Sequence, residues 1–196
     1  VMVYGEPWAG GTSQVQKGCS TSNINEASPD STVNGVGCFD DSYRNAIKGP
    51  EFGGFNFGEV QGVFAKSEDG KLDSISMGLS GSKEKVDVIG RFLNYVECHD
   101  NFTLFDKLSS SLVAGIQGTN DDNASAVNVW KSYDEMNDTE KKLVKSQQKL
   151  AGAFVILAQG TPFINGGQEF CRSKQGNPDS YAADKKGGKF WENIDE

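Results

Sequence analysis

The stretch NYVECHDNFTLFDKL, residues 94–108, shows the pattern on which the fold prediction rests. Residues 94–98 follow an apolar pair and predict a short buried strand. A polar turn, residues 99–101, comes directly after it. Apolar side chains then recur near helical spacing, at Phe102, Phe105, Leu108 and Leu112. We therefore expect a strand, a polar turn and an amphipathic helix, in this order.

Similar units recur on both sides of this stretch. Strands are predicted over 1–4, 36–39 and 161–164, the first of them buried. A helix over 42–48 is expected to begin at Asp40 or Asp41, and the longest helix begins at Asp138 or Thr139 and ends at Gly160. Residues 50–82 are rich in glycine and predict irregular structure. The alternation of strands and helices indicates an α/β fold with a parallel sheet or barrel.

Composition and charge exclude several classes of protein. The 196 residues carry 27 acidic and 19 basic side chains, a net charge of −8, which argues against a nucleic-acid partner. The longest apolar run, Ala151 to Ala158, is far too short to cross a membrane. With a single histidine and no Cys-x-x-Cys pair, a zinc site is not expected. The chain opens on Val1 inside an apolar run, from which we expect a piece of a longer protein.

The four cysteines leave two readings open. Cys19 and Cys38 lie in one loop-like stretch and would suit a disulfide, while four unpaired thiols explain the sequence equally well. Cys98 and Cys171 adjoin apolar segments, which predicts buried thiols.

Glu6 directly follows the first predicted strand, where parallel α/β folds place functional groups. A carboxyl between Tyr4 and Trp8 would be partly desolvated, which raises its pKa and suits a general acid. Trp8 offers a flat face on which a sugar ring could stack. The plainer alternative is that Glu6 caps a turn and Trp8 packs against the protein.

His99, Asp100 and Asn101 follow the third predicted strand in the same way. Histidine and asparagine can hydrogen-bond sugar hydroxyls, and an aspartate can stabilise developing positive charge. The alternative is that Asp100 and Asn101 only cap the following helix. Two carboxylates at the strand ends of one sheet suit a glycosidase. A nucleophilic-serine motif and a phosphate-binding loop are both absent from the sequence.

Several motifs, in order along the chain, resemble type I pullulanases, the α-1,6-debranching enzymes of the α-amylase superfamily. The strongest are YGEPW at 4–8 and the stretch at 94–108 quoted above. FDDSYRNAIKG at 39–49, QKLAGAFVILAQGTPF at 148–163 and GGQEFCRSK at 166–174 extend the similarity to about residue 181.

The resemblance implies a role for each matching residue. Glu6 would be the general acid/base and Asp100 the transition-state stabiliser. The substrate-binding residues would be Trp8, His99, Asn101, Arg172 and Asp179. The family's nucleophilic Asp lies on a fourth barrel strand in a segment that precedes YGEPW, so it has no counterpart here.

We therefore expect residues 1–196 to be the C-terminal half of a (β/α)8 TIM barrel, about strands 5 to 8 with long strand-end loops. Alone, the half would be inactive, and its partners would be an α-glucan and the missing N-terminal barrel half. The alternatives are a non-catalytic glucan-binding protein from a decayed barrel and an α-1,4-acting amylase relative. No cofactor or catalytic metal is expected, although the superfamily leaves room for a structural calcium ion. Acidity and a polysaccharide substrate favour a secreted or cell-surface location over the cytoplasm.

Overall fold

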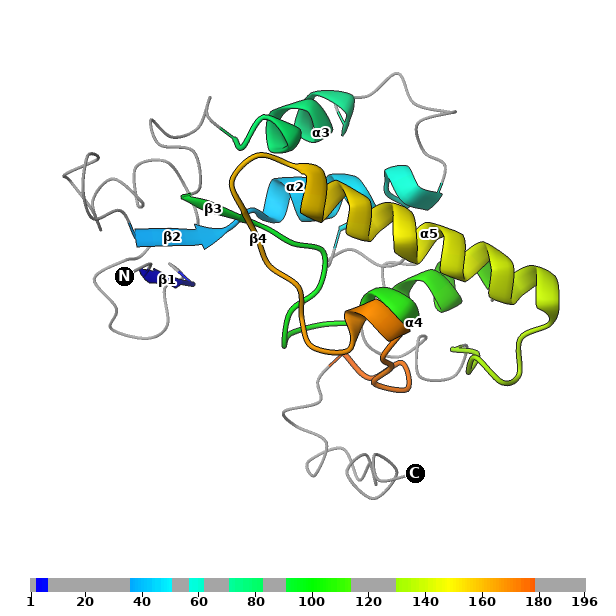
Figure 1. Cartoon of the computed structure of the whole chain (residues 1–196). Coiled ribbons are helices and arrows are strands. Elements are labelled where there is room, and N and C mark those ends of the chain that lie inside the picture. The colour runs from blue at the N-terminus through cyan, green and yellow to red at the C-terminus, as the bar shows by residue number, and fades with distance from the viewer. Residues whose placement is uncertain are drawn as a thin grey trace.

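Four strands form one parallel sheet, which confirms the α/β class (Figure 1). The third strand, predicted over 94–98, comprises Phe92–Asn94 instead, so the apolar pair before the predicted range belongs to the strand and residues 95–98 follow it. The computed structural model describes residues 3–6, 36–50, 57–61, 71–82, 91–113 and 130–178. The strands lie side by side in chain order: β1 (Val3–Gly5), β2 (Val36–Phe39), β3 (Phe92–Asn94) and β4 (Thr161–Pro162). Each pairs in parallel with the next. Their carboxyl ends therefore meet at one edge of the sheet.

Strand β1 lies at the end of this sheet, and its position corrects one prediction. The apolar run at the N-terminus predicts a buried strand, but Val3 is 55% exposed and Tyr4 is 45% exposed. Among the described strands β1 pairs with β2 alone, so only one of its sides is covered. β3 lies between two strands, and all three of its residues are buried.

Three helices accompany the strands as predicted. Helix α2 (Asp41–Lys48) follows β2, and its N-cap Asp40 accepts a hydrogen bond from the backbone N–H of Tyr43 at 3.2 Å. Helix α4 (Leu104–Leu108) follows β3 and continues into a π-helical turn, η3 (Ser109–Val113). Helix α5 (Asp138–Leu157) precedes β4. Its N-cap is Asn137, one residue before the earlier of the two predicted caps, and Asn137 forms a capping box with Glu140.

The expectation of irregular structure over residues 50–82 is wrong. This part of the chain contains a 3₁₀ turn, η1 (Glu59–Gln61), and helix α3 (Lys71–Leu79). Helix α3 packs on α2 because Gly78 has no side chain: a Cβ atom there would lie 2.0 Å from a ring carbon of Tyr43. Figure 1 shows α3, α2 and α5 stacked beside the sheet, with α4 next to α5.

The main core lies between these helices. Helix α5 contributes Val144, Ala151 and Val155 to it, all fully buried. Leu143 and Leu150 belong to the same predicted apolar stripe, but they are 38% and 45% exposed. The buried side of α5 is therefore narrower than its sequence suggests. Among the described helices, none is long and apolar enough to cross a membrane.

The cysteines divide into two kinds. Cys38, at the centre of the sheet, is disulfide-bonded, whereas Cys98 and Cys171 are free thiols and only partly buried. The predicted Cys19–Cys38 pair involves Cys19, which lies outside the described residues.

Candidate active site

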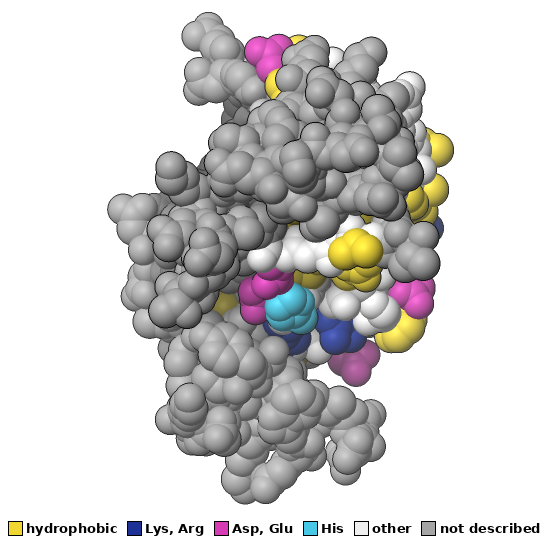
Figure 2. Space-filling view, turned by 90° about the vertical axis from the view of Figure 1, so that its left-hand side faces the viewer, with side chains coloured by type: hydrophobic (Ala, Val, Ile, Leu, Met, Phe, Trp, Pro, Cys, Tyr) yellow, Lys and Arg dark blue, Asp and Glu magenta, His cyan; other side chains and the backbone are white. Residues whose placement is uncertain are grey.

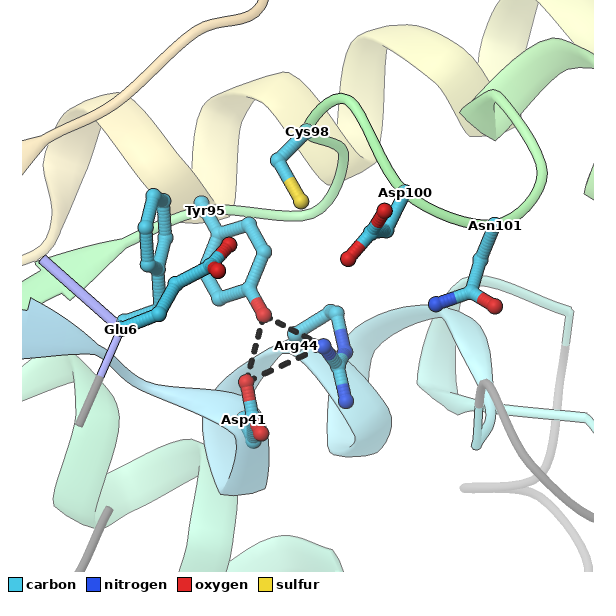
Figure 3. Close-up of a pocket in the computed structure, with 8 residues that line it drawn as sticks. Glu6, Asp41, Arg44, Tyr95, Cys98, Asp100 and Asn101 are labelled. Atoms are coloured by element: carbon cyan, nitrogen blue, oxygen red, sulfur yellow. Dashed lines mark hydrogen bonds and ion pairs between the residues drawn. The ribbon is translucent and has the colours of Figure 1, made fainter. Parts of the chain in front are cut away.

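A cavity of about 260 Å³ lies at the carboxyl ends of β1, β2 and β3 (Figure 3). Glu6 comes from the residue after β1, Asp41 and Arg44 from the first turns of α2, and Asp100 and Asn101 from the loop after β3. The remaining lining residues are Phe39, Tyr95 and Cys98. The sheet thus brings together three of the residues singled out in the sequence, although two of them lie more than ninety positions from the first.

Glu6, His99 and Asp100 form a cluster at the surface. Nε2 of His99 lies 3.3 Å from Oε1 of Glu6 and 3.6 Å from Oδ1 of Asp100. The three side chains are 34%, 67% and 51% exposed in the order Glu6, His99, Asp100. Figure 2 shows the histidine, in cyan, at the surface against acidic side chains in magenta. Solvent, and hence a soluble substrate, can reach both carboxylates.

A hydrogen-bonded trio forms one wall of the cavity (Figure 3). The hydroxyl of Tyr95 donates to Oδ1 of Asp41 and accepts from the guanidinium of Arg44. Arg44 also pairs with Asp41 at 3.0 Å and lies over the Tyr95 ring, 5.3 Å from its centroid. Burial raises the pKa of Tyr95 far above its ordinary value, so its hydroxyl stays protonated and remains a donor.

Aromatic rings support this wall from below. The rings of Phe39 and Tyr95 meet edge to face with centroids 4.8 Å apart, and Phe163 contacts Phe39 at 5.2 Å. Because these rings come from the ends of three neighbouring strands, they fix the strand ends relative to one another. The cavity is therefore lined by packed aromatic rings, Phe39 and Tyr95, beside its charged groups.

The loop after β3 does not serve as a helix cap. Helix α4 is capped by Thr103, whose Oγ1 accepts the backbone N–H of Asp106 at 3.1 Å. The alternative reading, in which Asp100 and Asn101 only cap the helix, is therefore wrong. Asn101 has a φ of 58°, a left-handed conformation that is uncommon for a residue other than glycine. The loop holds Asp100 and Asn101 at the cavity instead.

The structure places Arg172 beside this loop but not among the described residues that line the cavity. Its guanidinium contacts Oε1 of Glu97 at 3.3 Å. Glu97 is buried and also accepts hydrogen bonds from the backbone N–H of Leu104 and from Asn165, at 2.8 and 3.1 Å. A role for Arg172 in substrate binding stays a prediction. Trp8 and Asp179 lie outside the described residues.

The Glu6–His99–Asp100 cluster is the only group in the described part of the chain whose ligand atoms, all within 4.8 Å of one another, could hold a metal ion. Calcium takes six to eight oxygen ligands, whereas this cluster offers two carboxylates and an imidazole. The cluster therefore does not fit the structural calcium ion that the superfamily leaves room for.

Sequence reasoning missed most of the cavity wall. Asp41 and Arg44 resemble ordinary helix residues, and Tyr95 resembles a core aromatic residue. The available signal was position, since all three lie just after the apolar core of a strand. Glu97 and Asn165 carry no comparable signal, because they act through partners distant in sequence.

A parallel sheet with its strands in chain order and acidic groups at its carboxyl edge is an arrangement that α/β folds, including the (β/α)8 barrel, use for their active sites. Comparisons with known proteins specify the class further. The chain is 36% identical to a pullulanase of Bacillus subtilis (strain 168) over 154 residues, which is 75% of this chain and 17% of that protein. No protein-family model matches the chain.

Solved structures give the same result. A pullulanase of Anoxybacillus sp. LM18-11, crystallised with maltotetraose, aligns over 92% of this chain and 22% of its own with a TM-score of 0.63 and 26% identity. A type I pullulanase of Bacillus subtilis str. 168, crystallised with maltose, aligns over the same shares with a TM-score of 0.61 and 29% identity.

These similarities confirm the resemblance that the motifs predict. The chain is a relative of the type I pullulanases, which are starch-debranching glycosidases with an α-amylase-type fold. It spans about a fifth of the length of the proteins to which it is similar.

Proposed function

We propose that this chain is part of a retaining glycoside hydrolase that cleaves α-1,6 links in branched α-glucans such as pullulan, amylopectin or glycogen. The observation that carries the proposal is the approach of Glu6, His99 and Asp100 at the carboxyl edge of the sheet. The similarity to pullulanases, one of them crystallised with maltotetraose, supplies the substrate class. In this proposal β1 to β4 are strands 5 to 8 of a (β/α)8 barrel, and residues 1–196 are the C-terminal half of the catalytic domain.

The first step needs a proton donor and a stabilised cationic centre. Glu6 gives its proton to the glycosidic oxygen as a carboxylate nucleophile attacks the anomeric carbon and the bond to the leaving sugar breaks. Asp100 faces the same space and stabilises the oxocarbenium-like charge (Figure 3). His99 and Asn101 hydrogen-bond sugar hydroxyls on the donor side.

The second step releases the sugar. Glu6, now a carboxylate, takes a proton from water, whose oxygen attacks the anomeric carbon, and the nucleophile leaves as a carboxylate. The chain has no counterpart of the family's nucleophile, so a further segment supplies it. Residues 1–196 alone therefore form no covalent intermediate and show no turnover.

The test compares the whole protein that carries this chain with its Glu6→Gln variant, on pullulan. Glutamine keeps the shape of the side chain but cannot donate the proton. We expect kcat to fall by about 10²- to 10⁴-fold, with maltotetraose binding retained. Asp134→Asn is the matched control, because it removes an exposed carboxyl in a turn distant from the cavity in sequence, and it should leave kcat unchanged.

Three outcomes would contradict the proposal. A parent protein that binds pullulan and releases no maltotriose is a binding protein built on the barrel fold. A parent that cleaves only α-1,4 links is an amylase relative. Unchanged turnover in Glu6→Gln would remove Glu6 from the reaction.

A further inference from the structure

Lys174 is a buried lysine whose side chain points at the loop that carries the candidate catalytic groups. It is 4% exposed. Its Nζ donates hydrogen bonds to the backbone carbonyls of His99 and Asn101, both at 2.7 Å. Lysine is almost never buried unless it is paired, because removing an ammonium from water is costly. The two carbonyls that it binds stand on either side of Asp100.

Asp106 holds the segment that contains Lys174. Its Oδ2 accepts the backbone N–H of Lys174 at 2.8 Å, and its Oδ1 accepts the hydroxyl of Ser173 at 2.5 Å. Asp106 is fully buried in the first turn of α4, which begins directly after the loop. The loop, helix α4 and Lys174 are therefore linked in a ring of contacts. Asp106 of α4 holds the backbone of Lys174, and the Nζ of Lys174 in turn holds the loop that precedes α4.

The loop needs such a restraint. Asn101 is held in the left-handed region, an uncommon backbone conformation for a residue with a side chain, and such conformations are maintained by the surrounding structure. The carbonyl of Asn101 is one of the two bound by Lys174. If these bonds are lost, the backbone on both sides of Asp100 can relax, and the Asp100 carboxylate moves relative to Glu6.

We propose that Lys174 is a positioning residue that sets the backbone of the 99–101 loop and thereby the placement of His99 and Asp100 against Glu6. Its effect on the reaction rate rests on the proposed function, while its effect on the loop does not. Lys174 touches no substrate; it acts through the two carbonyls.

The test replaces Lys174 by methionine, which keeps the length of the side chain and removes its donors. Lys107→Met is the matched control: Lys107 is also buried, but its Nζ donates to the carbonyl of Pro50 at 3.0 Å, away from the loop. Both variants are made in the whole protein, and two quantities are measured: amide hydrogen exchange over residues 99–103, and kcat and KM on pullulan.

We expect Lys174→Met to speed exchange over 99–103 by at least about tenfold and to lower kcat by about 10- to 100-fold, since a displacement near 1 Å has an effect of this size. KM should change by less than about threefold, because the loss falls on the transition state. Lys107→Met should leave both quantities unchanged, even where it lowers the melting temperature.

Unchanged exchange over 99–103 in Lys174→Met would overturn the proposal, and so would the same increase in Lys107→Met. Should Lys174→Met not fold, Lys174→Gln carries the test with the same criteria, because its shorter amide reaches at most one carbonyl. If the unmodified protein does not cleave pullulan, the proposed function fails, but the exchange measurement still tests the role of Lys174.

Discussion

At the scale of single residues, Cys171 shows how partial burial against the main core controls the chemistry of a side chain. It is a free, half-buried thiol in the turn after η4 (Gln168–Phe170), with a φ of 66°. Burial raises the pKa of the thiol above its ordinary value of 9.0, and the nearby Lys145 offsets only part of this rise. The thiolate, which is the reactive form, is therefore depleted at neutral pH.

We accordingly predict slow alkylation of Cys171 in the folded protein. At about pH 7.5 iodoacetamide should modify it more slowly than in the denatured protein, because the raised pKa leaves less thiolate. The difference should narrow as the pH rises past the ordinary value of 9.0. Mass spectrometry of proteolytic peptides measures both rates, and Cys171→Ser identifies the peptide. Equal rates at neutral pH would show that burial does not shield this thiol.

Residues whose chemistry follows directly from their place in the sequence were predictable. Glu6 and Asp100 stand after strand-forming runs, and the parallel sheet brings them together. Lys174 and Glu97 were not predictable, because their roles depend on partners about 70 positions away. Glu97 stands in an apolar segment, which indicates a buried contact without naming the partner, whereas Lys174 stands in a polar stretch that gives no sign of its burial.

At the scale of elements, the contact between α2 and α3 rests on one glycine. Gly78→Ala should destabilise the protein by about 1–3 kcal/mol, because the new methyl group would overlap the buried Tyr43 ring. Gly152→Ala is the matched control: Gly152 lies in α5 with nothing within 4 Å of its Cβ position. It should stabilise the protein by about 0.5–1 kcal/mol, the usual gain of alanine over glycine in a helix.

Thermal or denaturant unfolding of the two variants measures this difference. Both substitutions improve helix propensity. A loss of stability in Gly78→Ala together with a gain in Gly152→Ala therefore isolates the packing contribution at Gly78. If both variants were stabilised, α3 could not pack on Tyr43 as the structure shows.

Strands and long helices were more predictable than the segment that contains α3. Strand β2 and helix α2 follow the predicted ranges closely, because an apolar run, an Asp cap and a glycine stop agree there. Helix α3 was missed because Gly70 and Gly81 flank its sequence and Gly78 lies within it, in a stretch rich in glycine. Gly78 reflects the close approach of α3 to Tyr43 of α2, which the local sequence does not reveal.

At the scale of the whole molecule, apolar side chains remain exposed on α5 and at the sheet edge. Leu143, Leu150 and Leu157 recur every seven residues along one side of α5 and are 38%, 45% and 77% exposed. Among the described strands β1 is paired on one side only, and its Val3 and Tyr4 are exposed. Surfaces of this kind favour association with other chains.

We predict that residues 1–196, produced alone, self-associate and unfold without a single cooperative transition. Replacing Leu143, Leu150 and Leu157 by glutamine should reduce the self-association and leave the helical content unchanged. Sedimentation and circular dichroism measure the two properties. A monomeric chain with a sharp thermal transition and affinity for maltodextrin would contradict the prediction and favour a self-sufficient binding module.

The link between Lys174 and the 99–101 loop has a consequence for biosynthesis. His99 and Lys174 are 75 positions apart, so the loop leaves the ribosome long before the lysine that holds it. Helix α5 and strand β4 are synthesised in between. The candidate catalytic carboxylates therefore reach their mutual arrangement late in translation, and a nascent chain that stops before β4 displays both acids without the geometry to use them.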